Sequence, residues 1–169
     1  MRTLDLAGLI RNNMRDKLIE LLTKHEGCIL HVYKDSLGID TIGVGRNIED
    51  RGISIDELQF LGYTYLSQVY EEGISESGAR YLLGNDIDII ERELYSAHSC
   101  VSDLSETRQI VLLNMAFNLG VPRLCKFYRM WAEIHEKDFD AAADEMLNSV
   151  WASQVKSRAY ELANMMREG

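Results

Sequence analysis

The spacing of hydrophobic positions predicts a mostly helical chain. Met14, Leu18 and Leu22 recur at helical spacing, and Gly27 stands where a helix usually ends. We therefore expect a first helix over residues 14–25, capped at its start by Asn12 or Asn13.

The next segment changes to a pattern typical of strands. Branched and aromatic residues dominate 28–33 and again 39–44, and the four residues Asp35-Ser-Leu-Gly38 separate the two runs. Asp at the first position and Gly at the fourth suit a type I turn. The pattern predicts a β-hairpin.

Helical patterns occupy the remainder of the chain. A capping box at Ser54–Glu57 predicts a helix that runs toward Tyr70 and ends before Gly73. Ser75 opens a longer pattern whose apolar stripe leaves Asp86 largely outside it. The run from Ser105 to Gly120 is apolar on nearly every side, which indicates a buried helix; three more helices are expected over 122–134, 139–147 and 151–166.

Strand patterns confined to the first third and helices thereafter indicate an α+β protein. We expect a small N-terminal mixed lobe with a helix and a β-hairpin or sheet, a long connecting helix, and a larger all-helical C-terminal lobe. The predicted limits, within one domain over 1–169, are an N-terminal extension 1–13, the small lobe 14–74, the connecting helix 75–97 and the helical lobe 98–169. A cleft between two lobes is a common place for a substrate.

Composition and charge exclude several classes of function. A hydrophobic content of 46% and a charged content of 27% are typical of a soluble globular protein. The net charge of −9 argues against a nucleic-acid partner, because phosphate binding needs clustered Lys and Arg. No apolar run is long enough for a membrane span, the N-terminal residues lack the features of a signal peptide, and three unpatterned cysteines suggest neither disulfides nor a metal site.

Two carboxyl groups near the predicted hairpin are candidates for acid–base chemistry. Glu26 follows Leu18 and Leu22 at steps of four, so we expect it partly buried at the negative end of the helix, where its pKa is raised as in a general acid. Asp35, in the turn, is expected to stay ionised. Such a pair is the usual equipment for cleaving a glycosidic bond, and the Thr41 hydroxyl can hold a water or a sugar oxygen. Taken singly, each residue also fits an ordinary structural role.

The combined pattern resembles a known family. Glu26-Gly27, Tyr33-Lys34-Asp35, Gly38 and Thr41-Ile-Gly-Val-Gly45 are similar to the catalytic segment of phage-type lysozymes, glycoside hydrolase family 24. The likeness extends over about residues 14–167. It implies a lysozyme-like fold and a peptidoglycan muramidase that hydrolyses the β-1,4 bond between N-acetylmuramic acid and N-acetylglucosamine, with inversion and without metal or cofactor.

The resemblance also assigns roles to residues. It implies that Glu26 is the general acid, that Asp35 assists water attack or stabilises the oxocarbenium-like state, and that Thr41 positions the water. Arg158 would pair with Glu26, and as a cation it would lower the pKa that the helix end raises. The residues expected to contact the glycan strand are Gly43, Gly45, Asn114, Asn118 and Arg158.

Two features depart from the family pattern. Arg46 occupies a position where the family often has histidine, and Asp86 is its expected partner, so this pair should lack a titration near neutral pH. The acidic net charge should make long-range attraction to an anionic cell wall weak or repulsive.

The resemblance further suggests a monomeric phage endolysin made in the host cytoplasm and released to the wall through a holin. Two alternatives remain open. A lytic transglycosylase uses a lone acid, which the presence of Asp35 and Thr41 disfavours. A non-catalytic peptidoglycan-binding or virion structural module would keep the fold without the activity.

Overall fold

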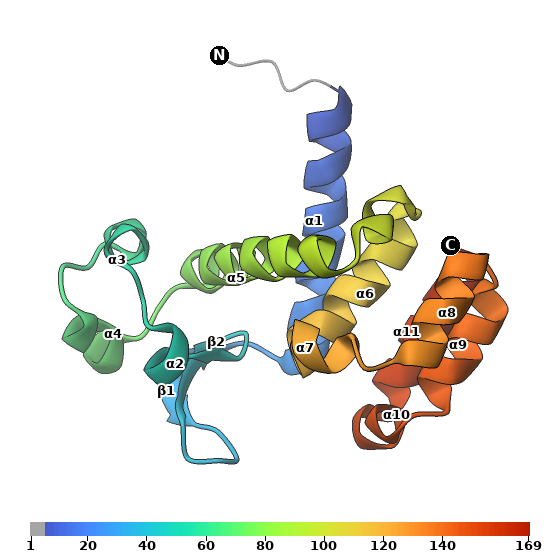
Figure 1. The fold of residues 1–169 in the computed structure, drawn as a ribbon. Helices are drawn as coiled ribbons and strands as arrows, with labels where there is room; N and C mark the ends of the chain where they lie inside the picture. The colour runs from blue at the N-terminus through green and yellow to red at the C-terminus, as the bar shows by residue number, and fades with distance from the viewer. Residues whose placement is uncertain (1–5) are drawn as a thin grey trace. The chain divides into compact units, whose positions relative to one another are not determined.

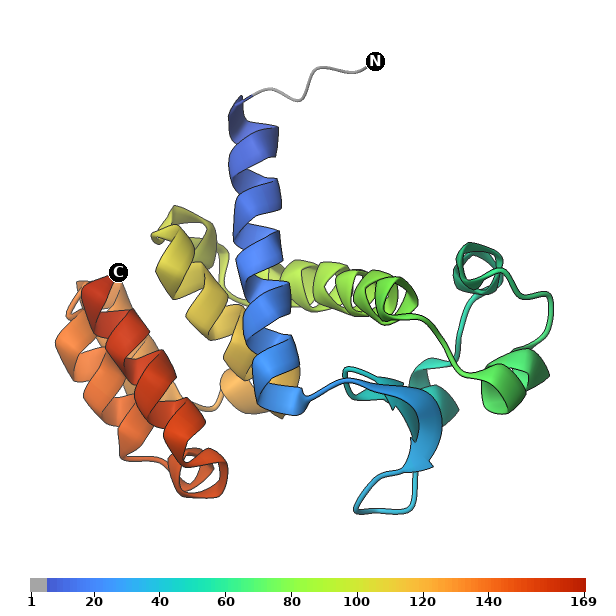
Figure 2. The same ribbon diagram turned by 180° about the vertical axis from the view of Figure 1, so that it is seen from behind.

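The computed structural model describes the backbone of residues 6–169 and the side chains of residues 13–169. Helices and one small antiparallel sheet make up this part of the chain (Figures 1 and 2), which confirms the predicted α+β class. The chain divides into two compact units. One, the mixed unit, is Ile19–Asp86; the other, the helical unit, joins the residues up to Leu18 to Ile87–Gly169. The lobe limits expected from the sequence stay predictions.

Helix α1, Leu6–Glu26, enters both units. It ends as predicted at Gly27, whose backbone has φ +78° and whose N–H donates to the Thr23 carbonyl at 3.0 Å. The predicted start at Asn12 or Asn13 is wrong, because the helical backbone continues through both residues. Residues 6–11 contain no proline and are mostly good helix formers, so nothing local stops the helix there. How the side chains of 1–12 pack lies outside the described residues.

The sheet of the mixed unit has three antiparallel strands in the order β1-β2-β3: Ile29–Lys34, Asp40–Gly43 and Arg46–Asn47. The predicted hairpin is therefore confirmed. Strand β3 was not predicted, because two residues carry no readable alternation. Thr41 pairs with Tyr33 on one side and with Asn47 on the other, so β2 is the central strand.

Short helices follow the sheet: α2 Ile48–Arg51, α3 Ile55–Leu61 and α4 Leu66–Glu72, before α5 Glu76–Ala97. The capping box of Ser54 and Glu57 forms as predicted. The single helix expected from Ser54 toward Tyr70 is wrong, since α3 stops at Gly62. Gly62 adopts φ +83°, and the next N–H, of Tyr63, returns to the Leu58 carbonyl at 2.8 Å, which is a Schellman ending.

The core of the mixed unit lies among the sheet, the short helices and the start of α5. Ile42 of β2, Val69 of α4 and Leu82 of α5 are at most 1% exposed. The first part of the apolar stripe that the sequence predicts for α5 is thus buried in the core of the mixed unit. Asp86, expected largely off the stripe, is buried as well.

The helical unit contains the second half of α5 and a succession of further elements. They are a short 3-10 turn Ser99–Asp103, α6 Glu106–Leu119, α7 Val121–Leu124, α8 Tyr128–Glu136, α9 Phe139–Leu147, α10 Val150–Val155 and α11 Ser157–Glu168. As predicted, α6 is the buried helix, and α9 has its predicted limits. Helices α8, α9 and α11 lie side by side (Figures 1 and 2). No helix in the described part of the chain has the length and apolar content to cross a membrane.

Two predicted helices of this unit are each broken in two. The expected helix 122–134 is interrupted between α7 and α8, where the Phe127 N–H bonds to the Leu124 carbonyl three residues back instead of continuing the α-helical pattern. The expected helix 151–166 breaks at Lys156, a non-glycine residue with φ +51°. Hydrophobic spacing continues across both breaks, which is why the sequence pattern did not reveal them.

Candidate active site

Glu26 is the last residue of α1, directly before the turn into the sheet. Leu18 and Leu22 are buried two turns and one turn earlier, at 1% and 0% exposure, but the side chain of Glu26 is exposed. The expected partial burial of Glu26 is therefore wrong, because the apolar stripe ends at Leu22 while the helix continues for one more turn. The strand that follows starts with Ile29 paired to Gly43, so the helix end leads into the sheet beside the Thr41–Gly45 segment.

Asp35 opens the turn between β1 and β2. Its carbonyl accepts from the Gly38 N–H at 3.0 Å, which closes the predicted turn. Its carboxylate Oδ1 accepts from the N–H groups of Leu37 and Ile39, at 2.8 and 2.9 Å. Both bonds use one oxygen, and within residues 13–169 no group donates to Oδ2. The turn thus fixes the carboxylate and leaves one of its oxygens available.

Thr41 lies in the middle of the sheet and is 4% exposed. Because Thr41 pairs with Tyr33 and the Asp35 N–H bonds to the Ile39 carbonyl, Asp35 and Thr41 are diagonal neighbours on one face of the hairpin. Such neighbours have Cα atoms about 7–8 Å apart. The Thr41 hydroxyl donates to the Ile39 carbonyl at 3.1 Å, so its oxygen can still accept.

The two glycines expected to admit the glycan differ in their surroundings. Both need glycine for their backbone, with φ +64° at Gly43 and +72° at Gly45. A Cβ on Gly43 would meet the Ala79 Cβ at 3.5 Å, whereas nothing lies within 4 Å of one on Gly45. Gly45 is exposed and Gly43 is buried against α5. Close approach to the backbone is therefore open at Gly45, and the substrate contact at both stays a prediction.

Arg46 forms the ion pair with Asp86 that the sequence predicts, its Nε donating to Oδ2 at 2.8 Å. The guanidinium also binds Glu57, through Nη2 to Oε1 at 2.9 Å, and the carbonyls of Gly52 and Leu82, both at 3.0 Å. Arg46, Glu57 and Asp86 are only 5–6% exposed. One side chain of β3 thus joins α2, α3 and α5 beneath the sheet.

We call the group of Arg46, Glu57, Asp86 and Arg51 the buried charge cluster. The pKa values of its two carboxyl groups shift in opposite directions. Burial raises the pKa of Glu57, but hydrogen bonds from Arg46, Asn85 and Ser54 outweigh it and lower the pKa to about 2. Burial raises the pKa of Asp86 more than Arg46 lowers it. Asp86 Oδ1 lies 2.9 Å from Arg51 Nε but lacks a well-aligned hydrogen bond, which fits the weaker compensation.

The remaining predicted residues belong to the helical unit. Asn114 is fully buried, and its Oδ1 accepts from Nε and Nη2 of Arg158, at 3.0 and 2.8 Å. Asn118 is exposed, and its Oδ1 accepts from the Trp151 Nε1 at 2.9 Å. Asn114 therefore orients the Arg158 guanidinium, while the exposed Asn118 holds the indole of the buried Trp151.

The structure thus groups the predicted residues by unit. Glu26, Asp35 and Thr41 lie in the mixed unit, whereas Asn114, Asn118 and Arg158 lie in the helical unit. The expected pairing of Glu26 with Arg158 joins the two units and stays a prediction. Sequence reasoning missed the bonds between Asn114 and Arg158, for which it offers no signal. It also missed the contact of Glu57 with Arg46, although the capping box had already marked Glu57 as a placed carboxylate.

Comparison with known proteins gives consistent matches. The family model described as phage lysozyme matches residues 23–164. Two proteins of Dictyostelium discoideum, probable T4-type lysozymes 2 and 1, are 29% and 27% identical over 164 aligned positions, and the alignments cover 92% of this chain and 96% of each relative. The pre-baseplate central spike protein Gp5 of Enterobacteria phage T4 is 29% identical over 168 aligned positions, and the alignment covers 94% of this chain but only 29% of that protein.

The matched region begins before Glu26 and extends past Arg158, so it includes every predicted site residue. Because the family model covers most of the chain, the chain belongs to the phage lysozyme family.

Proposed function

We propose that this protein hydrolyses the β-1,4 bond between N-acetylmuramic acid and N-acetylglucosamine in peptidoglycan. Membership of the phage lysozyme family carries the proposal, because it supports a muramidase-type glycoside hydrolase. The specific bond, the residue roles and the endolysin role are our inference.

Glu26 donates a proton to the glycosidic oxygen as that oxygen leaves the anomeric carbon. Its place at the exposed end of α1 allows a polymeric substrate to reach it. Asp35 acts from the turn through Oδ2, either by assisting the attack of water or by stabilising positive charge on the sugar ring. The two bonds to Oδ1 hold the carboxylate in place without backbone movement.

Thr41 positions the attacking water. Its hydroxyl donates a hydrogen bond to the Ile39 carbonyl, so its oxygen is oriented to accept a hydrogen bond from the water. The residue is 4% exposed, so little of its surface is open to contact with a sugar ring. Since Asp35 and Thr41 share one face of the hairpin, both can act on the same water molecule.

Replacement of Glu26 by glutamine tests the acid assignment. We expect Glu26→Gln to abolish the clearing of cell-wall suspensions while the free energy of unfolding changes by less than about 1 kcal/mol. Glu20→Gln is the matched control, because Glu20 is an exposed glutamate of the same helix and should keep full activity. Retained clearing by the Glu26 variant would refute the assignment.

Mass spectrometry of the digest tests the reaction. Reducing muramic ends are expected, whereas anhydro-muramic products would identify a lytic transglycosylase. Absence of any cleavage by the folded protein, with retained binding to peptidoglycan, would identify a non-catalytic wall-binding module. Proton NMR of fresh product should show the inverted anomer.

The endolysin role is a separate proposal. We infer synthesis in the host cytoplasm and release to the wall through a holin. Expression in bacteria should then cause lysis only when a holin is co-expressed, and the Glu26→Gln variant should cause none. Lysis without a holin would refute the release step but not the enzymatic activity.

A further inference from the structure

Tyr33 lies on the same face of the β-hairpin as two of the predicted catalytic residues. It is directly opposite Thr41 in the pairing of β1 with β2, and residues opposite each other have Cβ atoms about 4.5–5.5 Å apart. Asp35 follows Tyr33 by two residues, so its side chain is on that face as well. The family resemblance includes Tyr33 in its motif but assigns it no role. The structure makes it a direct neighbour of both residues.

The phenol of Tyr33 also lies near Glu26. Burial is the largest cause that raises the pKa of Tyr33, and the negative charges of Asp35 and Glu26 raise it further. In Figure 2 the end of α1, where Glu26 lies, leads by a short connection into β1, the strand that carries Tyr33. Because its pKa is raised, the phenol stays protonated and can donate a hydrogen bond wherever the carboxyl groups function.

The Tyr33 hydroxyl is a donor that the chain itself does not use. The side chain is half-buried, yet its hydroxyl forms no hydrogen bond within residues 13–169. In the same range, the one fully buried side-chain atom without a hydrogen bond is Asp86 Oδ1, so the Tyr33 oxygen is open to solvent. The half-buried Tyr63, in contrast, donates to the Gly73 carbonyl at 2.9 Å. The hydroxyl of Tyr33 is therefore left for a ligand.

We propose that the Tyr33 hydroxyl donates a hydrogen bond to an oxygen of the sugar at the cleaved bond, which makes Tyr33 a further catalytic residue. The inference rests on the proposed function, because it takes a glycan strand as the substrate. It goes further by adding a contact with the sugar on the face of the hairpin where Asp35 and Thr41 act.

The hairpin otherwise offers the sugar few donors. An ionised Asp35 only accepts hydrogen bonds, and the Thr41 hydroxyl already donates to the Ile39 carbonyl. In the proposed reaction Glu26 gives its proton to the leaving oxygen, so the other oxygens of the sugar need a different donor. A phenol supplies one, and the apolar face of its ring suits the C–H groups of a sugar.

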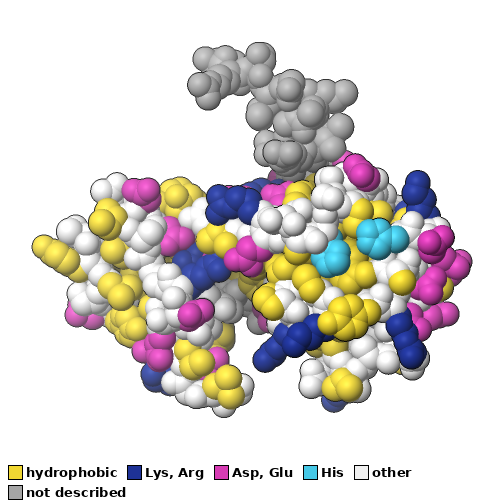
Figure 3. All heavy atoms as spheres, viewed as in Figure 1, with side chains coloured by type: hydrophobic (Ala, Val, Ile, Leu, Met, Phe, Trp, Pro, Cys, Tyr) yellow, Lys and Arg dark blue, Asp and Glu magenta, His cyan; other side chains and the backbone are white. Residues whose placement is uncertain are grey.

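The charge of the mixed unit favours an uncharged ligand group at this place. Residues 19–86 contain twelve Asp and Glu but only five Lys and Arg. Figure 3 shows acidic side chains spread over the visible face of this unit. Such a unit disfavours anionic groups of a ligand. A neutral hydroxyl of the protein that binds a neutral oxygen of the sugar avoids this repulsion.

The test compares Tyr33→Phe with the control Tyr63→Phe. Each variant removes one phenolic hydroxyl from a half-buried ring of the mixed unit and keeps the ring, so neither creates a cavity. Tyr63→Phe loses the bond to the Gly73 carbonyl, whereas Tyr33→Phe loses no bond within residues 13–169. The values of kcat and KM are measured on a soluble peptidoglycan oligosaccharide of defined length, and stability is measured by urea unfolding.

We expect Tyr33→Phe to lower kcat about ten- to a hundredfold, which is the scale of one lost hydrogen bond, with KM changed by less than about threefold. The loss falls on kcat because the sugar distorts toward the transition state, where a fixed donor binds it best. The urea midpoint should stay at the wild-type value. Tyr63→Phe should show the reverse, with wild-type kcat and a lower urea midpoint. An unchanged kcat in Tyr33→Phe would overturn the inference.

The pH profile separates direct contact from an effect through a neighbouring carboxyl group. Because the hydroxyl is neutral, its removal should lower kcat equally at every pH and leave the optimum in place. If the loss disappears at a shifted optimum, Tyr33 acts through the pKa of a carboxyl group and the contact with the sugar is refuted.

Cleavage by the wild-type chain is the separate measurement for the proposed function. If the wild type cleaves no glycan, the proposed function and this inference both fail. If the wild type cleaves and Tyr33→Phe cleaves at the same kcat, only the assignment of Tyr33 fails.

Discussion

Replacing Glu57 by glutamine removes one negative charge from the buried charge cluster while keeping the size of the side chain. Glutamine can still accept from the Ser54 N–H and so keeps the capping box. In the wild type, one carboxylate oxygen accepts hydrogen bonds from both Arg46 and Asn85. In the variant, the amide NH₂ takes the place of that oxygen and cannot accept from either. The variant therefore isolates the charge of Glu57 from its helix-capping role.

The pKa of Glu57 provides the magnitude. It falls from 4.5 to about 2 in the folded protein. At about 1.36 kcal/mol per pKa unit, this corresponds to about 3 kcal/mol of unfolding free energy at pH 7. Part of the loss is offset because Asp86 is freed from the repulsion of Glu57. We therefore expect Glu57→Gln to lower the free energy of unfolding by about 2–3 kcal/mol.

The pH dependence distinguishes this charge effect from damaged packing. Because the folded pKa of Glu57 is depressed, its contribution is fully present above pH 4.5 and is lost as pH falls toward 2. The difference between wild type and variant should fall to about half by pH 3. Urea unfolding followed by circular dichroism at pH 7, 5, 4 and 3 measures it.

The exposed Glu71→Gln serves as the control, with an expected change within about 0.5 kcal/mol at every pH. A difference between wild type and the Glu57 variant that stays constant from pH 7 to pH 3 would refute the electrostatic explanation. So would a difference smaller than about 1 kcal/mol at pH 7.

Three further predictions concern single residues. Arg46→His should lower the free energy of unfolding by about 3–5 kcal/mol, because it leaves Glu57 without its cation. Beside Asp86 the histidine pKa should rise, so stability is lost as pH rises through that pKa. The melting temperature plotted against pH from 5 to 8 should therefore change slope for the variant but not for the wild type. Trp151→Phe removes the bond to Asn118 and should lower the urea-unfolding free energy by about 0.5–1.5 kcal/mol; no change would show that water replaces the bond fully. Gly62→Ala should cost about 1–2 kcal/mol in thermal unfolding because of φ +83° alone, since nothing lies within 4 Å of an added Cβ; an unchanged melting temperature would contradict the left-handed helix ending.

Local sequence signals predicted the limits of a helix well where the hydrophobic pattern ends at a capping residue or a glycine. Ser75 and Gly120 gave the start of α5 and the end of α6, because caps and glycines act within one turn of the helix. The division at Gly62 was missed because apolar residues continue on both sides of it. The break at Lys156 carries no signal, since a lysine rarely adopts a positive φ.

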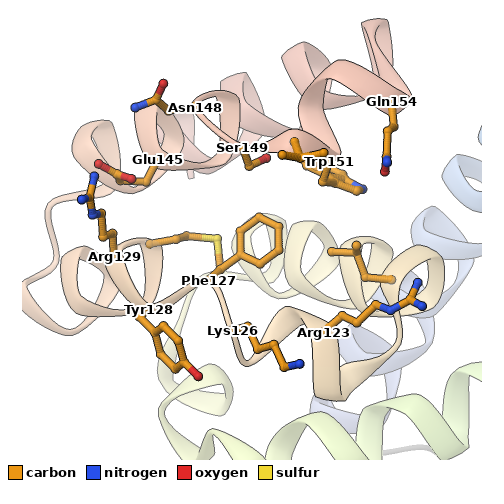
Figure 4. A pocket seen from close by; sticks show the side chains of 13 residues that line it. Arg123, Lys126, Phe127, Tyr128, Arg129, Glu145, Asn148, Ser149, Trp151 and Gln154 are labelled. Atoms are coloured by element: carbon orange, nitrogen blue, oxygen red, sulfur yellow. The ribbon is translucent and has the colours of Figure 1, made fainter.

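Contacts between distant residues were harder to predict. The partner of Arg46 was expected from a family resemblance, but no local pattern connects Arg46 to Glu57. A pocket of the helical unit that is lined by Arg123, Lys126 and Trp151 (Figure 4) was missed for the same reason: these residues come from separate helical segments, and an acidic total charge says nothing about a local cluster of cations.

Helix α1 has a consequence for the order in which the chain folds during synthesis. Its residues up to Leu18 belong with Ile87–Gly169, and Arg15 forms an ion pair with Asp88. The segment that leaves the ribosome early therefore waits for partners that are translated much later, whereas Ile19–Asp86 is continuous and has all its partners as soon as it emerges. We therefore expect the nascent chain to complete its mixed unit first, and the N-terminal part of α1 to dock only after the residues from Ile87 onward have been made.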